Sequence, residues 1–178
     1  FANGQITTKP FIDTFALLGG CGSTICILIA LTIFSKIPKR KKLCHIAGVP
    51  LLFNINELIV FGLPIVLNPI YLIPFVLTPL VCYSIAYFAT FTGIVPQIVN
   101  SSVQWTTPII ISGYRATGSV MGSILQILLL AVGVAIYTPF VLLDNRISKK
   151  NEKRYLDELT DICRSSEARG IPYSIADE

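Results

Sequence analysis

Charge is scarce in this chain, at 13% of its 178 residues, whereas hydrophobic residues make up 53%. Between positions 43 and 143, only Glu57 and Arg115 carry a full charge. Soluble domains have about one charged residue in four, so a stretch of this length cannot form an ordinary wetted surface. The composition therefore excludes an ordinary soluble domain and predicts a protein whose solvent is the lipid bilayer.

Metal-binding and disulfide patterns are also missing. The chain has a single histidine, His45, and its cysteines show no CxxC spacing: Cys21, Cys26, Cys44, Cys82 and Cys163. We therefore predict neither a zinc site nor a disulfide framework, and no cofactor. No signal-peptide pattern follows Phe1, and we expect the chain to begin within a longer protein.

Positive charge gathers in two clusters, residues 36–42 and 146–154, each directly after an apolar stretch. The positive-inside rule places both clusters in the cytoplasm. Because each cluster follows an apolar stretch, we interpret it as a set of stop-transfer charges at the cytoplasmic end of a membrane segment. We predict no nucleic-acid partner.

Three apolar stretches have about the twenty residues that a membrane helix requires: 11–34, 70–93 and 119–143. The first and third end at basic clusters, so both run from outside to inside, and the second must return to the outside. Pro74 and Pro79 should kink this returning helix.

Two further apolar stretches, 44–69 and 95–118, contain too many prolines and glycines to cross as continuous helices. Non-helical backbone at membrane depth is tolerated where protein or a water-filled cavity satisfies its polar groups. By the topology above, the two stretches enter from opposite sides, as at a midplane site of a transporter.

The fold prediction is an all-α integral membrane protein with about three transmembrane helices and two re-entrant hairpins that enter from opposite sides. Residues 1–145 form the substrate-binding transmembrane domain of this prediction. Residues 146–178 form a cytoplasmic amphipathic tail, with apolar residues at helical spacing.

Glu57 lies with Asn54 and Asn56 in a polar group inside the first broken stretch. An acid at membrane depth costs about 2.5–3.5 kcal/mol on insertion scales, which makes Glu57 a candidate functional residue. Carboxyl and amide groups suit the hydroxyls of a sugar, and they also suit an ion. In the alternative interpretation, Glu57 caps a broken helix end or pairs with Arg115.

Trp105, the single tryptophan, is followed by Thr106 in the second broken stretch. An indole plane can pack on the apolar face of a sugar ring while its N–H finds a polar partner. In the alternative interpretation, Trp105 is an anchor at the membrane interface.

Residues 53–69, FNINELIVFGLPIVLNP, closely resemble the signature of the membrane subunit, enzyme IIC, of the bacterial phosphotransferase system in its lactose, cellobiose and diacetylchitobiose branch. Residues 8–22 and 103–117 resemble two other parts of that subunit, and the resemblance covers nearly all of 1–145. Several positions depart from the branch's pattern: Leu58, Gln104, Ile109 and Arg115.

The resemblance implies the carboxy-terminal half of a multi-pass sugar permease in the bacterial inner membrane, dimeric in the complete protein. Such a permease binds a disaccharide at mid-membrane, moves it inward and presents its C6 hydroxyl to a phosphocysteine on the IIB subunit. The partners implied are the disaccharide and the IIB and IIA subunits. The phosphoryl donor lies outside this chain, so the resemblance leaves open whether the chain itself is an enzyme and implies no catalytic residue in it.

By position, the resemblance makes Asn56 and Glu57 hydrogen-bond partners of the sugar and places a ring against Trp105, with Thr106 as a further substrate-binding residue. Two other functions stay open. In one, Glu57 binds a proton or cation in an ion-coupled transporter. In the other, a degenerate permease domain serves as a membrane sensor or anchor.

Overall fold

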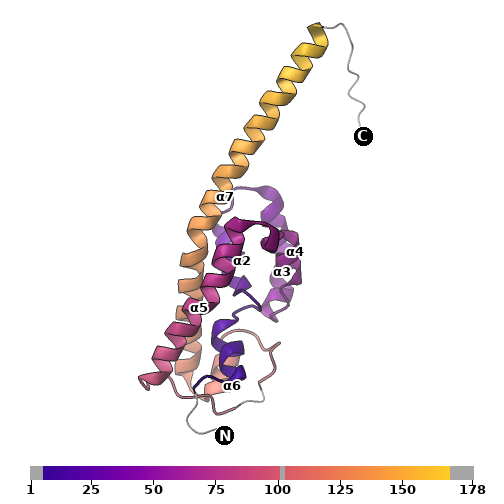
Figure 1. The fold of residues 1–178 in the computed structure, drawn as a ribbon. Helices are drawn as coiled ribbons and strands as arrows, with labels where there is room; N and C mark the ends of the chain where they lie inside the picture. The colour runs from indigo at the N-terminus through magenta and orange to yellow at the C-terminus, as the bar shows by residue number, and fades with distance from the viewer. Residues whose placement is uncertain (1–5, 101–102, 169–178) are drawn as a thin grey trace. The chain divides into compact units, whose positions relative to one another are not determined.

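The computed structural model describes residues 6–100 and 103–168, and these residues form helices and loops without a strand (Figure 1). This confirms the all-α prediction. The chain divides into two compact units, Phe1–Leu143 and Asp144–Glu178. The elements are α1 (Lys9–Phe11), the π-helical η1 (Ile12–Ala16), α2 (Thr24–Phe34), α3 (Pro38–Leu52), α4 (Glu57–Gly62), the 3-10 helix η2 (Ile65–Leu67), α5 (Pro69–Phe91), α6 (Ile111–Thr117) and α7 (Val120–Ala168).

The first predicted membrane span, 11–34, is interrupted. A loop at 17–23 separates η1 from α2, and it contains backbone with positive φ at Gly19, Gly20, Gly22 and Ser23. The prediction of one continuous helix is wrong because hydropathy counts apolar residues and does not register the left-handed turns that glycine permits. With 11 residues, α2 is too short to cross a bilayer core of about 30 Å.

Within the described part of the chain, two helices are long and apolar enough to cross a membrane: α5, and α7 over Val120–Arg164. They contain nearly all of the predicted spans 70–93 and 119–143. The start of α5 is well defined, because Asn68 Oδ1 accepts a hydrogen bond of 3.1 Å from the backbone N–H of Ile70. The helix then continues through Pro74 and Pro79.

Both stretches predicted to be broken are broken. In 44–69, α3 ends at Leu52, a turn follows, and two short helices, α4 and η2, complete the stretch. In 95–118, the described residues before α6, 95–100 and 103–110, are non-helical. In contrast to the predicted boundary, α3 begins at Pro38, inside the first basic cluster.

The core of the first unit lies where η1 packs on α5 and α2 packs on α3. Tyr137 of α7 is fully buried, and its hydroxyl donates a hydrogen bond of 2.7 Å to the carbonyl oxygen of Gly22. A Cβ atom at Gly133 of α7 would collide with Cys26 of α2, so a glycine is needed for the two helices to approach this closely. These contacts fix the loop at 17–23.

The second unit consists of the continuation of α7 up to Ala168, and the rest of the predicted tail lies outside the described residues. Side chains from 149 to 164 are all exposed. Among them are Tyr155, Leu156, Leu159 and Ile162, which form the apolar pattern expected of an amphipathic tail helix.

Candidate binding site

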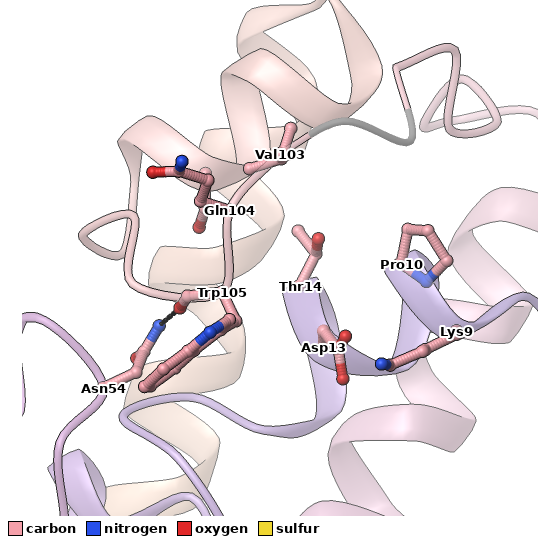
Figure 2. A pocket seen from close by; sticks show the side chains of 9 residues that line it. Lys9, Pro10, Asp13, Thr14, Asn54, Val103, Gln104 and Trp105 are labelled. Atoms are coloured by element: carbon pink, nitrogen blue, oxygen red, sulfur yellow. Dashed lines mark hydrogen bonds between the residues drawn. The ribbon is translucent and has the colours of Figure 1, made fainter.

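The turn at 53–56, between α3 and α4, ties the first broken stretch to the second. Asn54 adopts a left-handed conformation with φ of 63°, which asparagine tolerates better than most residues. Its Nδ2 donates to the carbonyl oxygen of Trp105 (Figure 2). The same nitrogen lies 3.4 Å from the carbonyl oxygen of Thr107. One side chain thus fixes the backbone of a distant segment.

The loop at 17–23 packs against the other side of this turn. Asn56 Nδ2 donates a hydrogen bond of 3.0 Å to the carbonyl oxygen of Cys21. Gly20 has φ of 92°, and a Cβ atom there would lie 2.9 Å from the carbonyl oxygen of Asn54 and 3.0 Å from Asn56 Nδ2. Only glycine fits both this conformation and this spacing.

Two cavities lie where these segments meet. The first, here called the Glu57 cavity, has a volume of about 240 Å³ and is lined by Asp13, Leu17, Gly20, Cys21, Asn54, Asn56, Glu57 and Trp105. The second, here called the Lys9 cavity, has a volume of about 310 Å³ and is lined by Lys9, Pro10, Asp13, Thr14, Asn54, Val103, Gln104, Trp105 and Ser112 (Figure 2). Asp13, Asn54 and Trp105 line both.

Three of the four predicted site residues, Asn56, Glu57 and Trp105, therefore line one cavity. Thr106 lines neither cavity. Among the described residues, the Glu57 side chain forms no hydrogen bond and no ion pair, so it makes none with Arg115. Its carboxyl oxygens are available to a ligand in the cavity.

Trp105 combines an exposed side chain with a fixed backbone. Its side chain is 64% exposed, although it stands at the wall shared by the two cavities. The hydrogen bond from Asn54 holds its carbonyl group. The fixed backbone places the indole at this wall, where its plane can pack on a ligand ring.

The sequence interpretation did not assign Lys9, Asp13 and Gln104 to a site. Lys9 and Asp13 are four residues apart in the consecutive helical turns of α1 and η1, so both face the same side. In Figure 2 the end of the Lys9 side chain points toward Asp13. This i, i+4 pair at the edge of an apolar stretch was the only feature of the sequence that could have indicated these residues as part of a site.

Gln126 of α7 is a second residue that sequence reasoning missed. It is fully buried, and its Nε2 donates to the carbonyl oxygen of Thr14 at 2.8 Å and to Ser112 Oγ at 2.9 Å. Its Oε1 accepts from the backbone N–H groups of Ile110 at 2.7 Å and Gly113 at 3.0 Å. Two of these four bonds position residues that line the Lys9 cavity, Thr14 and Ser112.

Ile110 precedes α6 with φ of 80°, an outlier for a β-branched residue. Its N–H is held by Gln126, and its carbonyl oxygen accepts a hydrogen bond of 2.6 Å from Ser123 Oγ. Such a conformation persists only where its surroundings determine it. Two side chains from one face of α7 therefore hold the segment that leads into α6.

A family model and several relatives indicate one family. A family model described as "Phosphotransferase system, EIIC" matches residues 2–79. The oligo-beta-mannoside-specific EIIC component of Bacillus subtilis strain 168 is 38% identical over 150 residues, which cover 84% of this chain and 34% of that protein. The cellobiose-specific EIIC component of Geobacillus stearothermophilus is 43% identical over 137 residues, 76% of this chain and 30% of that protein.

A solved structure supports the same similarity. The crystal structure of the transporter ChbC, the IIC component from the N,N'-diacetylchitobiose-specific phosphotransferase system, matches with a TM-score of 0.78 and 37% identity. The match covers 82% of this chain and 34% of that one. The chain spans about a third of the length of the curated relatives that it matches.

Proposed function

This chain belongs to the EIIC family of the phosphotransferase system, and from that premise we propose that it forms the sugar-binding part of a disaccharide permease. Relatives carry names that specify cellobiose, lactose and oligo-beta-mannosides. The observation that carries the proposal is the Glu57 cavity, in which Asn56, Glu57 and Trp105 meet.

The chemistry of this cavity suits a sugar. Glu57 accepts hydrogen bonds from hydroxyl groups, which are stronger when the acceptor is charged. Asn56 can accept through Oδ1 while its Nδ2 holds Cys21. Trp105 supplies a plane for the apolar face of a ring.

Phosphoryl transfer asks a protein mainly to position the reacting groups. In our proposal this chain positions the hydroxyl that accepts the phosphoryl group, and the phosphoryl donor is carried by a IIB partner that is recharged by IIA. The chain therefore contributes substrate-binding residues and no catalytic residue of its own. The complete permease is a homodimer in this proposal.

EIIC proteins are membrane components, and α5 and α7 provide two candidate spans. We place the chain as a multi-pass protein in the bacterial inner membrane, with 44–69 and 95–118 as re-entrant segments from opposite sides. What supports this placement is that both segments are broken and that Asn54 of one bonds to Trp105 of the other. Segments that meet in this way surround a midplane site in other transporters.

The test is equilibrium binding of radiolabelled cellobiose, lactose and diacetylchitobiose to the complete natural protein, wild type beside Glu57→Gln. The variant keeps the shape of the side chain and loses its charge, so affinity should fall about tenfold or more, as expected for hydrogen bonds to a charged group. Glu152→Gln is the matched control, because Glu152 is exposed in the tail helix. Equal affinity in wild type and Glu57→Gln would contradict the proposed role.

One observation favours a second function. Asp13 and Glu57 line the same cavity, and two acids also suit a coupling cation. Uptake into membrane vesicles separates the two functions. Transport that requires phosphoenolpyruvate supports the permease of the phosphotransferase system, whereas transport driven by an ion gradient alone supports a cation-coupled transporter.

A further inference from the structure

The exposed face of α3 changes in character along the helix. Its first turns carry three exposed lysines, Lys39, Lys41 and Lys42. Later turns on the same side carry apolar side chains that are each more than half exposed: Ile46, Val49 and Leu52. Spacings of three and four residues keep these positions on one side of a helix. A single face therefore runs from cationic to apolar within one helix.

The opposite face of α3 is held against the rest of its unit. Cys44, Ala47 and Leu51 are buried in the core. Arg40 is also used internally, because its Nη1 donates a hydrogen bond of 3.3 Å to the hydroxyl of the buried Tyr71. These contacts fix which face of α3 is exposed.

The lysines of α3 have no acidic neighbour to balance them. No Asp or Glu occurs between positions 13 and 57 of the sequence. Among the described residues, the side chains of Lys39, Lys41 and Lys42 form no hydrogen bond and no ion pair. The second basic cluster differs, because it contains an acid, Glu152. Cations this close repel one another, so the start of α3 favours an anionic partner.

The length of α3 matches half the thickness of a membrane. Its 15 residues span about 22 Å as an α-helix. Half of a bilayer, with its headgroup region, measures about 20–22 Å. A helix that begins among the cytoplasmic headgroups and runs along the membrane normal therefore brings the turn at 53–56 close to the midplane.

The pattern on this face favours a lipid over a soluble acidic partner. A soluble partner could satisfy the lysines and would leave the apolar turns in water. A bilayer satisfies both parts, since anionic headgroups attract the lysines and acyl chains cover the apolar turns.

We propose that α3 binds an anionic phospholipid of the cytoplasmic leaflet, with Lys39, Lys41 and Lys42 on the headgroup and Ile46 and Val49 against the acyl chains. This inference uses the cytoplasmic entry of 44–69 given under the proposed function. It does not depend on which sugar the chain binds.

The experiment places an indole on this face. The complete natural protein with Val49→Trp is reconstituted in nanodiscs of phosphatidylcholine that contain either brominated phosphatidylglycerol or the same amount of brominated phosphatidylcholine. Bromine on the acyl chains quenches an indole that it touches, and the protein without the substitution supplies the background. Brominated phosphatidylglycerol should quench the new indole more strongly, and Lys41→Gln should lower this preference about fivefold, the factor expected for one lysine at a membrane surface.

Matched variants keep the result specific. The triple variant Lys39→Gln, Lys41→Gln and Lys42→Gln should abolish the preference. Removal of the same charge from the second basic cluster, by changing lysines 149, 150 and 153 to Gln, should leave the preference within about twofold. All of these lysines are exposed, so the Tm should stay the same and show that the fold is intact.

Several results would overturn the inference. An indole that neither brominated lipid quenches would show that protein covers this face. Equal quenching by the two lipids, or an equal loss of preference in the two triple variants, would exclude a specific contact with the lysines of α3. Loss of the preference in the presence of soluble glycerol 3-phosphate would indicate a site for small anions instead. Equal sugar affinity in wild type and Glu57→Gln would contradict the proposed function and leave this inference standing.

Discussion

Gln126 shows how one buried amide can organise a site that it does not enter. Both polar atoms of its side chain are fully used. Nε2 donates to Thr14 and Ser112, and Oε1 accepts from two backbone N–H groups. Around it α7 is apolar. The amide therefore fixes the relative positions of η1, α6 and the segment before α6.

Replacing Gln126 by Leu should destabilise the protein strongly. The variant leaves several buried donors and acceptors without a partner, and we expect the free energy of unfolding to fall by about 3–5 kcal/mol. Thermal denaturation of the purified protein measures this as a lower Tm. Gln104→Leu is the matched control, because the Gln104 side chain is exposed and makes no hydrogen bond among the described residues. Equal Tm values for the two variants would refute the role of Gln126.

Cys21 gives a second prediction, which requires no mutation. It is exposed and lines the Glu57 cavity, whereas Cys26 and Cys82 are buried. Bound cellobiose should slow alkylation of Cys21 by N-ethylmaleimide, because the sugar occupies the space in front of the thiol. Exposed Cys163, in the tail helix, should react at the same rate with and without sugar.

Peptide mapping by mass spectrometry gives both rates in one sample, so Cys163 is an internal control. If cellobiose binds and the rate at Cys21 is unchanged, the sugar does not occupy the Glu57 cavity.

At the level of single residues, the sequence indicated only part of the site. Glu57 and Asn56 were recognisable as polar residues in an apolar stretch, and the structure places both in one cavity. Gln126 was equally polar in an equally apolar stretch, but a lone amide does not show which backbone groups it will meet. Lys9 was missed because a charge near the end of an apolar segment is usually exposed to water.

At the scale of elements, the loop at 17–23 is the feature for which hydropathy gave the wrong prediction of a continuous helix. Its apolar composition continues that of the segments on either side, so a window average joins them into one span. The broken stretches 44–69 and 95–118 were predicted correctly because proline and glycine interrupt helices for local steric reasons. Contacts between the loop and the turn at 53–56 depend on tertiary packing, which no local pattern encodes.

Gly20→Ala should disrupt the Glu57 cavity. The new Cβ would collide with the Asn54 carbonyl group and the Asn56 side chain, and alanine disfavours φ of 92° by about 1–2 kcal/mol. We expect a lower Tm and a loss of sugar affinity. Gly48→Ala is the control, because Gly48 lies inside α3 with no atom within 4 Å of the added Cβ.

Because Gly48 lies in a helix, this control substitution should raise the free energy of unfolding by about 0.5–1 kcal/mol. A Gly20→Ala protein that bound sugar as tightly as Gly48→Ala would show that the loop does not shape the cavity.

At the scale of the whole molecule, apolar side chains cover the outside of the long helices. On α5 the exposed ones include Leu72, Ile73, Val76, Leu77 and Leu80. Exposure of such a surface to water is unfavourable, whereas contact with lipid or further protein is favourable. This surface agrees with membership of a family of membrane components.

Membrane orientation is tested by labelling Cys163. The basic cluster 146–154 precedes it, and the positive-inside rule places this part of the chain in the cytoplasm. A membrane-impermeant maleimide should label Cys163 in inside-out vesicles and not in intact cells. Detergent-solubilised protein provides the control for intrinsic reactivity, and labelling of Cys163 in intact cells would reverse the proposed orientation.

Asp13 and Glu57, the two acids of the Glu57 cavity, bear on what happens after the sugar has reacted. A sugar arrives neutral, and under the proposed function it acquires a phosphate while it is still near both side chains. Like charges at short range repel, most strongly where water is scarce. The same residues that hold the sugar would then expel its phosphate ester, so phosphorylation itself would give the transport cycle its direction.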